Sequence, residues 1–183
     1  FTLRIIPSSE IEETTEVFDG NDRLQSNLNE YSLSDILSTL SEKGQQYPAI
    51  GQLTENGKIT VLDGSRRRAA CVLAKKDYWI YVTDKSISYD YKKHLSDVAN
   101  VSKPLSIFEL GYRFKRLLEA QDNKPAKYDT IQDLSNGEKV TLSIVSNAVR
   151  AVTDIPEDIV RCIPSIADLG RPSANTLRSI VLE

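Results

Sequence analysis

Two hydrophobic patterns take turns along the first hundred residues of the chain. A loose alternation over residues 2–7 and a β-branched and aromatic run over residues 78–84 predict strands. Between them, apolar residues at positions 33, 36, 37 and 40 have the spacing of one helix face. We expect this helix to begin with Ser32 or Ser34 as its N-cap and to end at Gly44.

The segment after this helix has the pattern of a β-hairpin. Two short runs with β-branched residues flank Asn56-Gly57, a pair that suits a type I′ turn. A helix then starts at Ser65, and a further helix is predicted over residues 88–100. Strands and helices therefore interleave, which predicts a small mixed domain and an α+β fold class.

The strand pattern stops at Pro104, and only helical patterns follow. One helix, with apolar residues from Ile107 to Leu118 on one face, is predicted to end near residues 121–125, and two short helices with a glycine-containing turn follow within residues 128–156. Such a pair is the layout of a helix-turn-helix. Two further short helices are expected after Pro156 and after Pro172. We therefore predict two domains: a mixed domain over residues 1–103 and an all-helical domain over residues 104–183.

The composition narrows the possible functions. The 183 residues carry a net charge of −3, so any binding to nucleic acid has to come from local basic clusters. No apolar run is long enough to span a membrane and there is no signal-peptide pattern, so a cytoplasmic protein without a membrane partner is expected. A single histidine argues against a histidine metal site or a Ser-His-Asp triad. We expect Cys71 and Cys162 to be reduced and buried, and the chain, which begins with Phe1, to be a fragment.

The densest basic cluster is "DGSRRRAA" at residues 63–70, where a strand gives way to a helix. Unpaired N–H groups at a helix start attract anions, and guanidinium groups bind phosphate oxygens. The site would consist of Gly64, Ser65, Arg66 and Arg67. Successive helical residues lie about 100° apart, so at most two of the three arginines can reach one ligand. The alternative is a solvated helix face. Asp63 could orient an arginine or cap the helix, and we expect the cap.

Two neighbouring segments could complete a nucleotide site. Gln45 and Gln46, in the turn that follows the first helix, carry amides suited to reading the edge of a nucleobase. Asn100 could help to hold a magnesium ion, and Lys103 could meet a phosphate. Each segment could instead be ordinary loop or cap chemistry.

The second helix of the helix-turn-helix has polar residues near its start. Such residues can contact bases or phosphates in the major groove. The candidates are Thr141, Ser143, Ser146, Asn147 and Arg150. Residues 123–163 contain five Lys or Arg and six Asp or Glu, so the module is not basic. Attraction to the DNA backbone would then come from Arg113, Lys115 and Arg116 or from dimerisation, and an ordinary helical hairpin remains the alternative.

Taken together and in this order, these segments resemble the ParB family of centromere-binding partition proteins, and in particular its plasmid branch (SopB type). "GNDRLQ", "GQQYPAIG", "DGSRRRAA" and "ANVSKPLSIFELG" carry the resemblance. It implies that the mixed domain binds CTP with Mg2+ and that the helical domain binds double-stranded centromere DNA. It also implies a homodimer that closes as a sliding clamp, a ParA-type ATPase as partner, and association with a plasmid or the nucleoid.

The resemblance also assigns roles residue by residue. Residues 64–67 match the family's "GERR" phosphate motif, and residues 44–48 match its "GxxQP" turn. Asn100 and Lys103 match the asparagine and arginine of "ENxxR". Tyr47, Ser65 and Ala99 depart from these motifs, and Lys103 is a lysine where the motif has arginine. Ala99 replaces the glutamate linked to hydrolysis, so CTP binding is expected while CTPase activity stays open.

Other roles remain compatible with the sequence. Glu109 or Asp97 could substitute for the missing glutamate. The chain could be a helix-turn-helix transcription repressor without nucleotide chemistry. It could also be a nucleotide-dependent small-molecule enzyme on the same fold, although Ser65 stands where sulfiredoxin has its cysteine.

Overall fold

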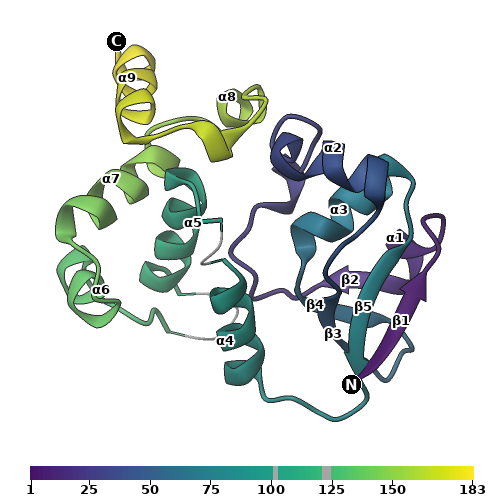
Figure 1. Ribbon diagram of the computed structural model, residues 1–183. Coiled ribbons are helices and arrows are strands. Elements are labelled where there is room, and N and C mark those ends of the chain that lie inside the picture. The colour runs from purple at the N-terminus through teal and green to yellow at the C-terminus, as the bar shows by residue number, and fades with distance from the viewer. Residues whose placement is uncertain (101–102, 121–124) are drawn as a thin grey trace. The chain divides into compact units, whose positions relative to one another are not determined.

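The computed structural model describes residues 1–100, 103–120 and 125–183, and these form two compact units (Figure 1). The first unit comprises Phe1–Asn21 and Gln25–Pro104, and the second comprises Asp22–Leu24 and Leu105–Glu183. The α+β fold class is confirmed, because the first unit contains a sheet with helices and the second is helical. The division into domains 1–103 and 104–183 stays a prediction. No helix in the described part of the chain is long and apolar enough to span a membrane.

The sheet of the first unit is mixed and has the strand order β1-β5-β3-β4-β2. Its strands are β1 (Thr2–Ile6), β2 (Thr15–Val17), β3 (Ala49–Leu53), β4 (Ile59–Asp63) and β5 (Tyr78–Thr83). The β1–β5 and β3–β4 pairs are antiparallel, whereas β3–β5 and β2–β4 are parallel. The edge strand β2 was not predicted, because three residues are too few to show an alternating pattern.

Four helices belong to this unit: α1 (Ile11–Thr14), α2 (Ser34–Lys43), α3 (Ser65–Ala74) and α4 (Tyr89–Ala99). Helices α1, α2 and α3 share one hydrophobic core with the sheet, in which Ile11, Leu33 and Cys71 are completely buried. Helix α2 packs on α3, and α4 contacts β4. Since α2 and α3 both lie against the sheet, their ends are fixed relative to the β4–α3 junction.

The β3–β4 hairpin forms as predicted, but the predicted type I′ turn is wrong. A type I′ turn needs positive φ at both central residues, and here only Gly57 has one (φ 83°). The Gly57 N–H donates to Thr54 O, so residues 54–57 form a turn whose last residue, Gly57, has the left-handed conformation. The side-chain oxygen of Asn56 accepts from Lys58 N, which supports this longer loop.

The predicted caps of α2 and α9 also need correction. Leu33 occupies the N-cap position of α2, because the Ser32 hydroxyl instead donates to Asn27 O. Gly44 ends α2 as expected, with φ 71°. Pro172 was expected to precede the last helix, but it lies in its first turn, where proline needs no N–H donor.

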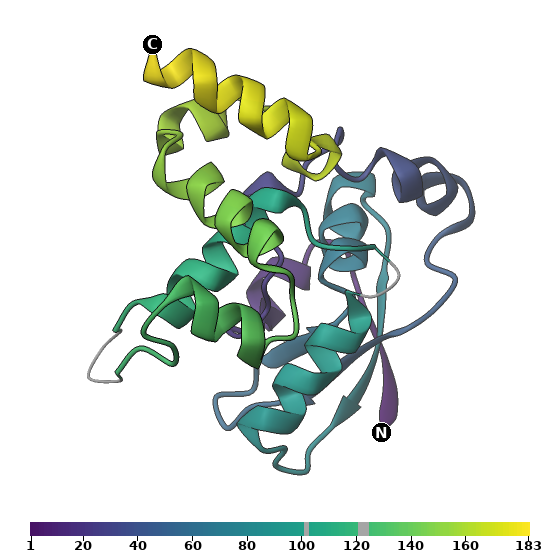
Figure 2. The ribbon, with the colours of Figure 1, turned by 90° about the vertical axis from the view of Figure 1, so that its left-hand side faces the viewer.

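The second unit contains α5 (Ile107–Leu118), α6 (Ile131–Gly137), α7 (Leu142–Thr153), α8 (Glu157–Arg161) and α9 (Arg171–Leu182). Figure 2 shows α6 and α7 as the consecutive helices of the predicted helix-turn-helix. Helix α5 packs closely on α7, and a Cβ atom at Gly111 would lie 2.2 Å from Ala148 O. Glycine therefore permits this helix contact.

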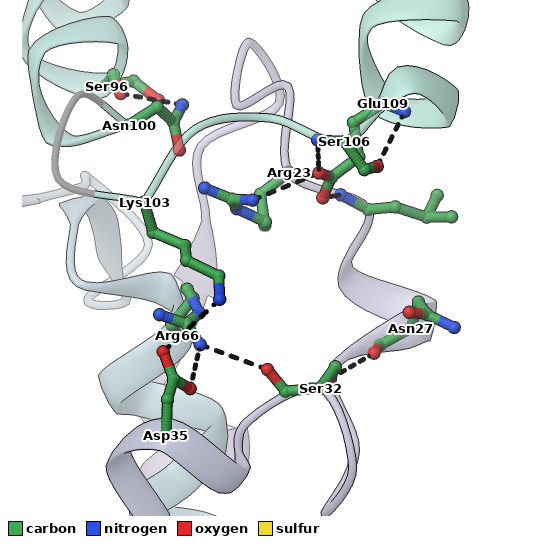
Figure 3. A network of polar contacts seen from close by, with 11 residues as sticks. Arg23, Asn27, Ser32, Asp35, Arg66, Ser96, Asn100, Lys103, Ser106 and Glu109 are labelled. Carbon is green, nitrogen blue, oxygen red and sulfur yellow. Dashed lines mark hydrogen bonds and ion pairs between the residues drawn. The ribbon is translucent and has the colours of Figure 1, made fainter. Parts of the chain in front are cut away.

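Residues 22–24 are bound to the start of α5 (Figure 3). The Glu109 carboxylate accepts from Arg23 Nη1 at 3.1 Å, from Leu24 N at 3.0 Å and from Ser106 N at 2.8 Å. The Arg23 and Glu109 side chains are both almost completely buried. Because a buried charge is tolerated only with a full set of partners, this cluster fixes the segment.

Candidate functional site

The junction between β4 and α3 requires a glycine. Gly64 has φ 99°, in the left-handed region, and a Cβ atom there would lie 2.6 Å from Ala49 Cβ. Its carbonyl accepts a hydrogen bond from the Tyr78 hydroxyl at 3.3 Å. Ser65, the first residue of α3, is buried. The junction is therefore held in place from the sheet side, and α3 starts in a defined direction.

The three arginines of α3 point to different partners. Arg66 Nη2 donates to Asp35 Oδ1 at 2.5 Å and to Ser32 O at 3.1 Å. Arg68 donates to the hydroxyl and the carbonyl of Thr15, and so it holds the edge strand β2. Because the guanidinium of Arg68 is bound to Thr15, Arg66 and Arg67 are the two arginines that remain for a ligand.

Arg67 lies at the pocket described below. Its Nη2 donates to Asp63 Oδ2 at 2.9 Å, so the expected role of Asp63 as a helix cap is wrong: α3 has no side-chain cap bond, and Asp63 orients an arginine. The Arg67 Nε is buried and has no hydrogen-bond partner among the described residues. A buried donor without a partner is costly, and a ligand oxygen would satisfy it.

A pocket of about 250 Å³ joins Arg67 to the turn after α2. A face of α2 forms one wall of the pocket, and the turn after α2 forms one of its ends. The lining residues are Asp35, Ile36, Thr39, Leu40, Gly44, Gln45, Gln46, Tyr47 and Arg67. The structure thus brings the glutamine-rich turn and the arginine helix together at one pocket.

The two glutamines of the turn differ in their surroundings. The Gln45 amide is buried: its Nε2 donates to the carbonyls of Tyr47 and Trp79, and its Oε1 accepts from Trp79 N at 2.9 Å. Gln45 therefore connects the turn to β5. Gln46 is exposed and makes only long bonds, 3.3 Å, to nearby carbonyls. Tyr47 is 75% exposed and offers its ring at the pocket.

The predicted lysine reaches the same site. Lys103 Nζ lies 3.6 Å from Asp35 Oδ2, so Asp35 contacts both Lys103 and Arg66 (Figure 3). Burial acts to raise the pKa of Asp35, but the hydrogen bond and charge of Arg66, with the charge of Lys103, outweigh it and lower that pKa. Asn100 Nδ2 donates to Ser96 O at 3.1 Å.

The described residues contain no group of three or more His, Cys, Asp or Glu side chains that could hold a metal ion. The two carboxylates considered as substitutes for a catalytic glutamate already have partners. Asp97 Oδ1 pairs with Lys93 Nζ at 2.5 Å, and Glu109 accepts three hydrogen bonds. Neither is therefore placed as a general base in this structure.

The polar residues of α7 are arranged on its outer side. Thr141 occupies the N-cap position without a side-chain cap bond, and it is exposed together with Ser143 and Arg150. Asn147 Nδ2 donates to Ser143 O at 2.8 Å, while Ser146 is partly buried. Val145, Ala148 and Ala151 form the opposite, buried side. Helix α7 therefore presents a polar surface at its N-terminal half.

The arginines of α5 that were expected to attract DNA have acidic partners. Arg113 Nη2 donates to Glu138 Oε2 at 2.8 Å, and Arg116 pairs with Asp22. Lys115 is more loosely placed, 3.9 Å from Glu119. These pairs reduce the positive charge that α5 can offer to phosphate.

Sequence reasoning missed Asp35 and Thr39. Both lie on the pocket face of α2, at the i and i+4 spacing, but polar residues at such positions usually face solvent. No pattern in the sequence distinguishes them from solvated positions.

Comparison with known proteins shows sequence relatives along nearly the whole chain. Protein SopB of Escherichia coli O157:H7 is 30% identical over 178 residues, which are 97% of this chain and 52% of that protein. The "Plasmid Partition par B protein" of Escherichia coli is 33% identical over 181 residues, 98% of this chain and 50% of that protein. The virulence regulon transcriptional activator VirB of Shigella flexneri is 30% identical over 166 residues, 90% of this chain and 50% of that one.

The chain therefore spans about half the length of the relatives it matches. No protein-family model matches it. Among solved structures, C-terminally truncated ParB from Caulobacter crescentus in complex with CTP-gamma-S aligns over all of both chains, with 20% identity and a TM-score of 0.46. The same protein in complex with the centromeric parS site aligns over 97% of this chain and 84% of that one, with 21% identity and a TM-score of 0.44.

Proposed function

Because the chain is a homologue of the ParB-type plasmid partition proteins across both of its units, we propose that it binds CTP and centromere DNA in a partition system. The observation that carries the proposal is the 30–33% identity to two partition proteins over 97–98% of the chain. The first unit would bind the nucleotide, and the second would recognise double-stranded DNA of the parS type. The complete protein would act as a homodimer that closes into a sliding clamp and works with a ParA-type ATPase.

The pocket along α2 supports nucleotide binding. Its turn end, with Gln46 and Tyr47, offers an amide and an aromatic ring for a nucleobase. Its other end has Arg67, whose buried Nε lacks a partner among the described residues. Arg66 and Lys103 both contact Asp35, which also lines the pocket. The phosphates would lie at these three cations.

A magnesium ion fits this site as a companion of the nucleotide. Protein-bound Mg2+ takes oxygen ligands and commonly shares phosphate oxygens. Since the described residues contain no acidic cluster, the triphosphate would supply most ligands and the Asn100 amide oxygen would be the protein donor. The ion would neutralise phosphate charge. With Ala99 at the glutamate position and Asp97 and Glu109 engaged, we assign binding to this site and no residue to hydrolysis.

The outer face of α7 supports DNA recognition. In a helix-turn-helix the second helix enters the major groove with its N-terminal residues. Asn147 has the donor and acceptor pair that suits adenine, and the exposed Arg150 suits guanine or phosphate. Thr141, Ser143 and Ser146 would contact the backbone or bases nearby.

Calorimetric titration tests the nucleotide part of the proposal. The chain is titrated with each of four ribonucleoside triphosphates and Mg2+, with and without double-stranded centromere DNA of the parS type. We expect binding selective for CTP. Arg67→Ala should abolish that binding and leave DNA recognition intact, and Arg150→Ala should do the opposite. Absence of binding by any nucleotide, even with DNA, would refute the nucleotide role.

A second candidate function is transcription regulation. The specific observation that favours it is the 30% identity to VirB, a transcriptional activator, over 90% of the chain. A regulator would bind operator DNA near promoters and need no ParA-type partner. Plasmid-loss assays separate the two functions: deleting the gene should destabilise a low-copy plasmid if the protein partitions DNA, and should change only transcript levels if it regulates.

A further inference from the structure

One carboxylate bridges two of the cations assigned to phosphate. Asp35, in the first turn of α2, contacts Arg66 Nη2 at 2.5 Å through Oδ1 and Lys103 Nζ at 3.6 Å through Oδ2 (Figure 3). It also lines the pocket together with Arg67. Two cations on opposite oxygens of one anionic group is the arrangement that a phosphate would have.

We propose that Asp35 is a positioning residue that sets the affinity of this pocket for polyphosphate. Its carboxylate takes the place of a phosphate oxygen at Arg66 in the nucleotide-free chain and gives up that place when a triphosphate binds. This inference rests on the proposed nucleotide site and deepens it, because it adds a competing anion that belongs to the protein itself.

The surroundings of Arg66 favour such an exchange. A second, neutral acceptor, Ser32 O at 3.1 Å, stays on Nη2 and keeps the guanidinium aimed at the site when the carboxylate leaves. The Asp35 side chain is 42% exposed, so water can solvate it after release. In contrast, the Arg23–Glu109 pair is almost completely buried and has no such route.

The competition also follows from charge. Asp35 carries a negative charge at neutral pH, and an unreleased carboxylate at the pocket wall would repel a triphosphate. Removing the charge should therefore strengthen anion binding, whereas a residue with only a structural role would weaken it or leave it unchanged. This difference in sign is the basis of the test.

The experiment measures the affinity of the whole chain for inorganic tripolyphosphate and for CTP, both with Mg2+, by calorimetry. We expect Asp35→Asn to bind both ligands at least about threefold more tightly than the unchanged chain, which is what loss of a partly exposed ion pair allows. Asp35→Glu, which keeps the charge, should not show this gain in affinity. This gain in affinity should shrink at high salt, because salt screens both the Asp35 ion pair and the attraction between the cations and the anionic ligand.

Asp90→Asn is the matched control, since Asp90 also lies in the first turn of a helix, is exposed, and does not line the pocket. It should leave both affinities unchanged. Asp35→Ala is a second charge-removing variant should Asp35→Asn fail to fold, because alanine has a high helix propensity.

The outcomes separate the inference from the function on which it rests. Equal or weaker binding of both ligands by the folded charge-removing variants overturns the role of Asp35, even where CTP binding itself is confirmed. Tighter tripolyphosphate binding by these variants supports the role of Asp35, and it does so even where the titrations with four ribonucleoside triphosphates show no preference for CTP and thereby refute the proposed CTP function. Absence of both tripolyphosphate binding and CTP binding in every form overturns both the role of Asp35 and the proposed nucleotide function.

Discussion

Replacing Gly64 with alanine tests whether the β4–α3 junction positions the arginines. Two costs are expected. The backbone there has φ 99°, and left-handed conformations cost an alanine about 1–2 kcal/mol. In addition, the new Cβ would lie 2.6 Å from Ala49 Cβ, and relieving such overpacking costs about 1–3 kcal/mol.

Gly57→Ala separates these two costs. Gly57 has a similar φ of 83°, but a Cβ atom there would meet nothing within 4 Å. Both substitutions gain equally from the stiffer unfolded chain, so this contribution cancels between them. The free energy of unfolding of Gly64→Ala should therefore lie about 1–3 kcal/mol below that of Gly57→Ala, and the difference measures the clash.

Urea unfolding followed by fluorescence is a suitable assay. The single tryptophan, Trp79, lies in β5 of the same unit and reports on that unit alone. A difference of about 2 kcal/mol should separate the two urea midpoints by about 1 M. Gly64→Ala should also lose nucleotide binding, while Gly57→Ala keeps it. Coincident midpoints, or full nucleotide affinity in Gly64→Ala, would refute the reasoning.

Three further predictions concern the turn, the helix contact and a thiol. Gln45→Ala should lower the free energy of unfolding by about 1–3 kcal/mol because it removes the amide that bridges the turn to β5, whereas Gln46→Ala should keep the stability of the unchanged chain; equal unfolding midpoints would contradict this. Gly111→Ala should reduce both stability and DNA affinity, because its Cβ would lie 2.2 Å from a carbonyl oxygen of α7. Gly170→Ala is the control: its nearest contact would be at 3.6 Å, so thermal melts and DNA titrations should show no change. Cys71 is buried as predicted, but Cys162 is exposed, so its predicted burial is wrong. Burial raises the pKa of Cys71 to about 12, so in the folded chain at pH 8 only Cys162 should react with a thiol reagent, and both should react in urea. Rapid labelling of two thiols without urea would show that the core is open.

The sequence predicted most regular elements because their signals are local. Helical spacing identified α2 and α5, alternation identified β1, and a β-branched and aromatic run identified β5. The turn at the β4–α3 junction could also be predicted from its glycine, since few residues other than glycine suit a turn that needs positive φ. The segments that resemble ParB-family motifs were likewise identified from the amino-acid sequence, and they led to the nucleotide and DNA predictions.

The roles of individual side chains depended on contacts between distant segments. Gln45 and Gln46 are adjacent and chemically identical, yet only the first is buried and bonded to β5. Likewise, Arg66 and Arg68 differ by two positions, but one contacts the pocket residue Asp35 and the other holds β2. Composition and spacing do not predict these differences, because each one depends on which distant segment of the chain packs against the side chain.

The sequence by itself determined most of the helices and strands, that an arginine-rich helix start follows a strand, and to which proteins the chain is related. Only the tertiary structure decided that Asp35 neutralises two of the candidate phosphate ligands and that the Arg67 Nε is buried without a partner among the described residues. The physical reason is that local propensity acts over a few neighbouring residues. Hydrogen bonding, burial and charge in a site are instead set by residues that the fold brings together from far apart in the chain.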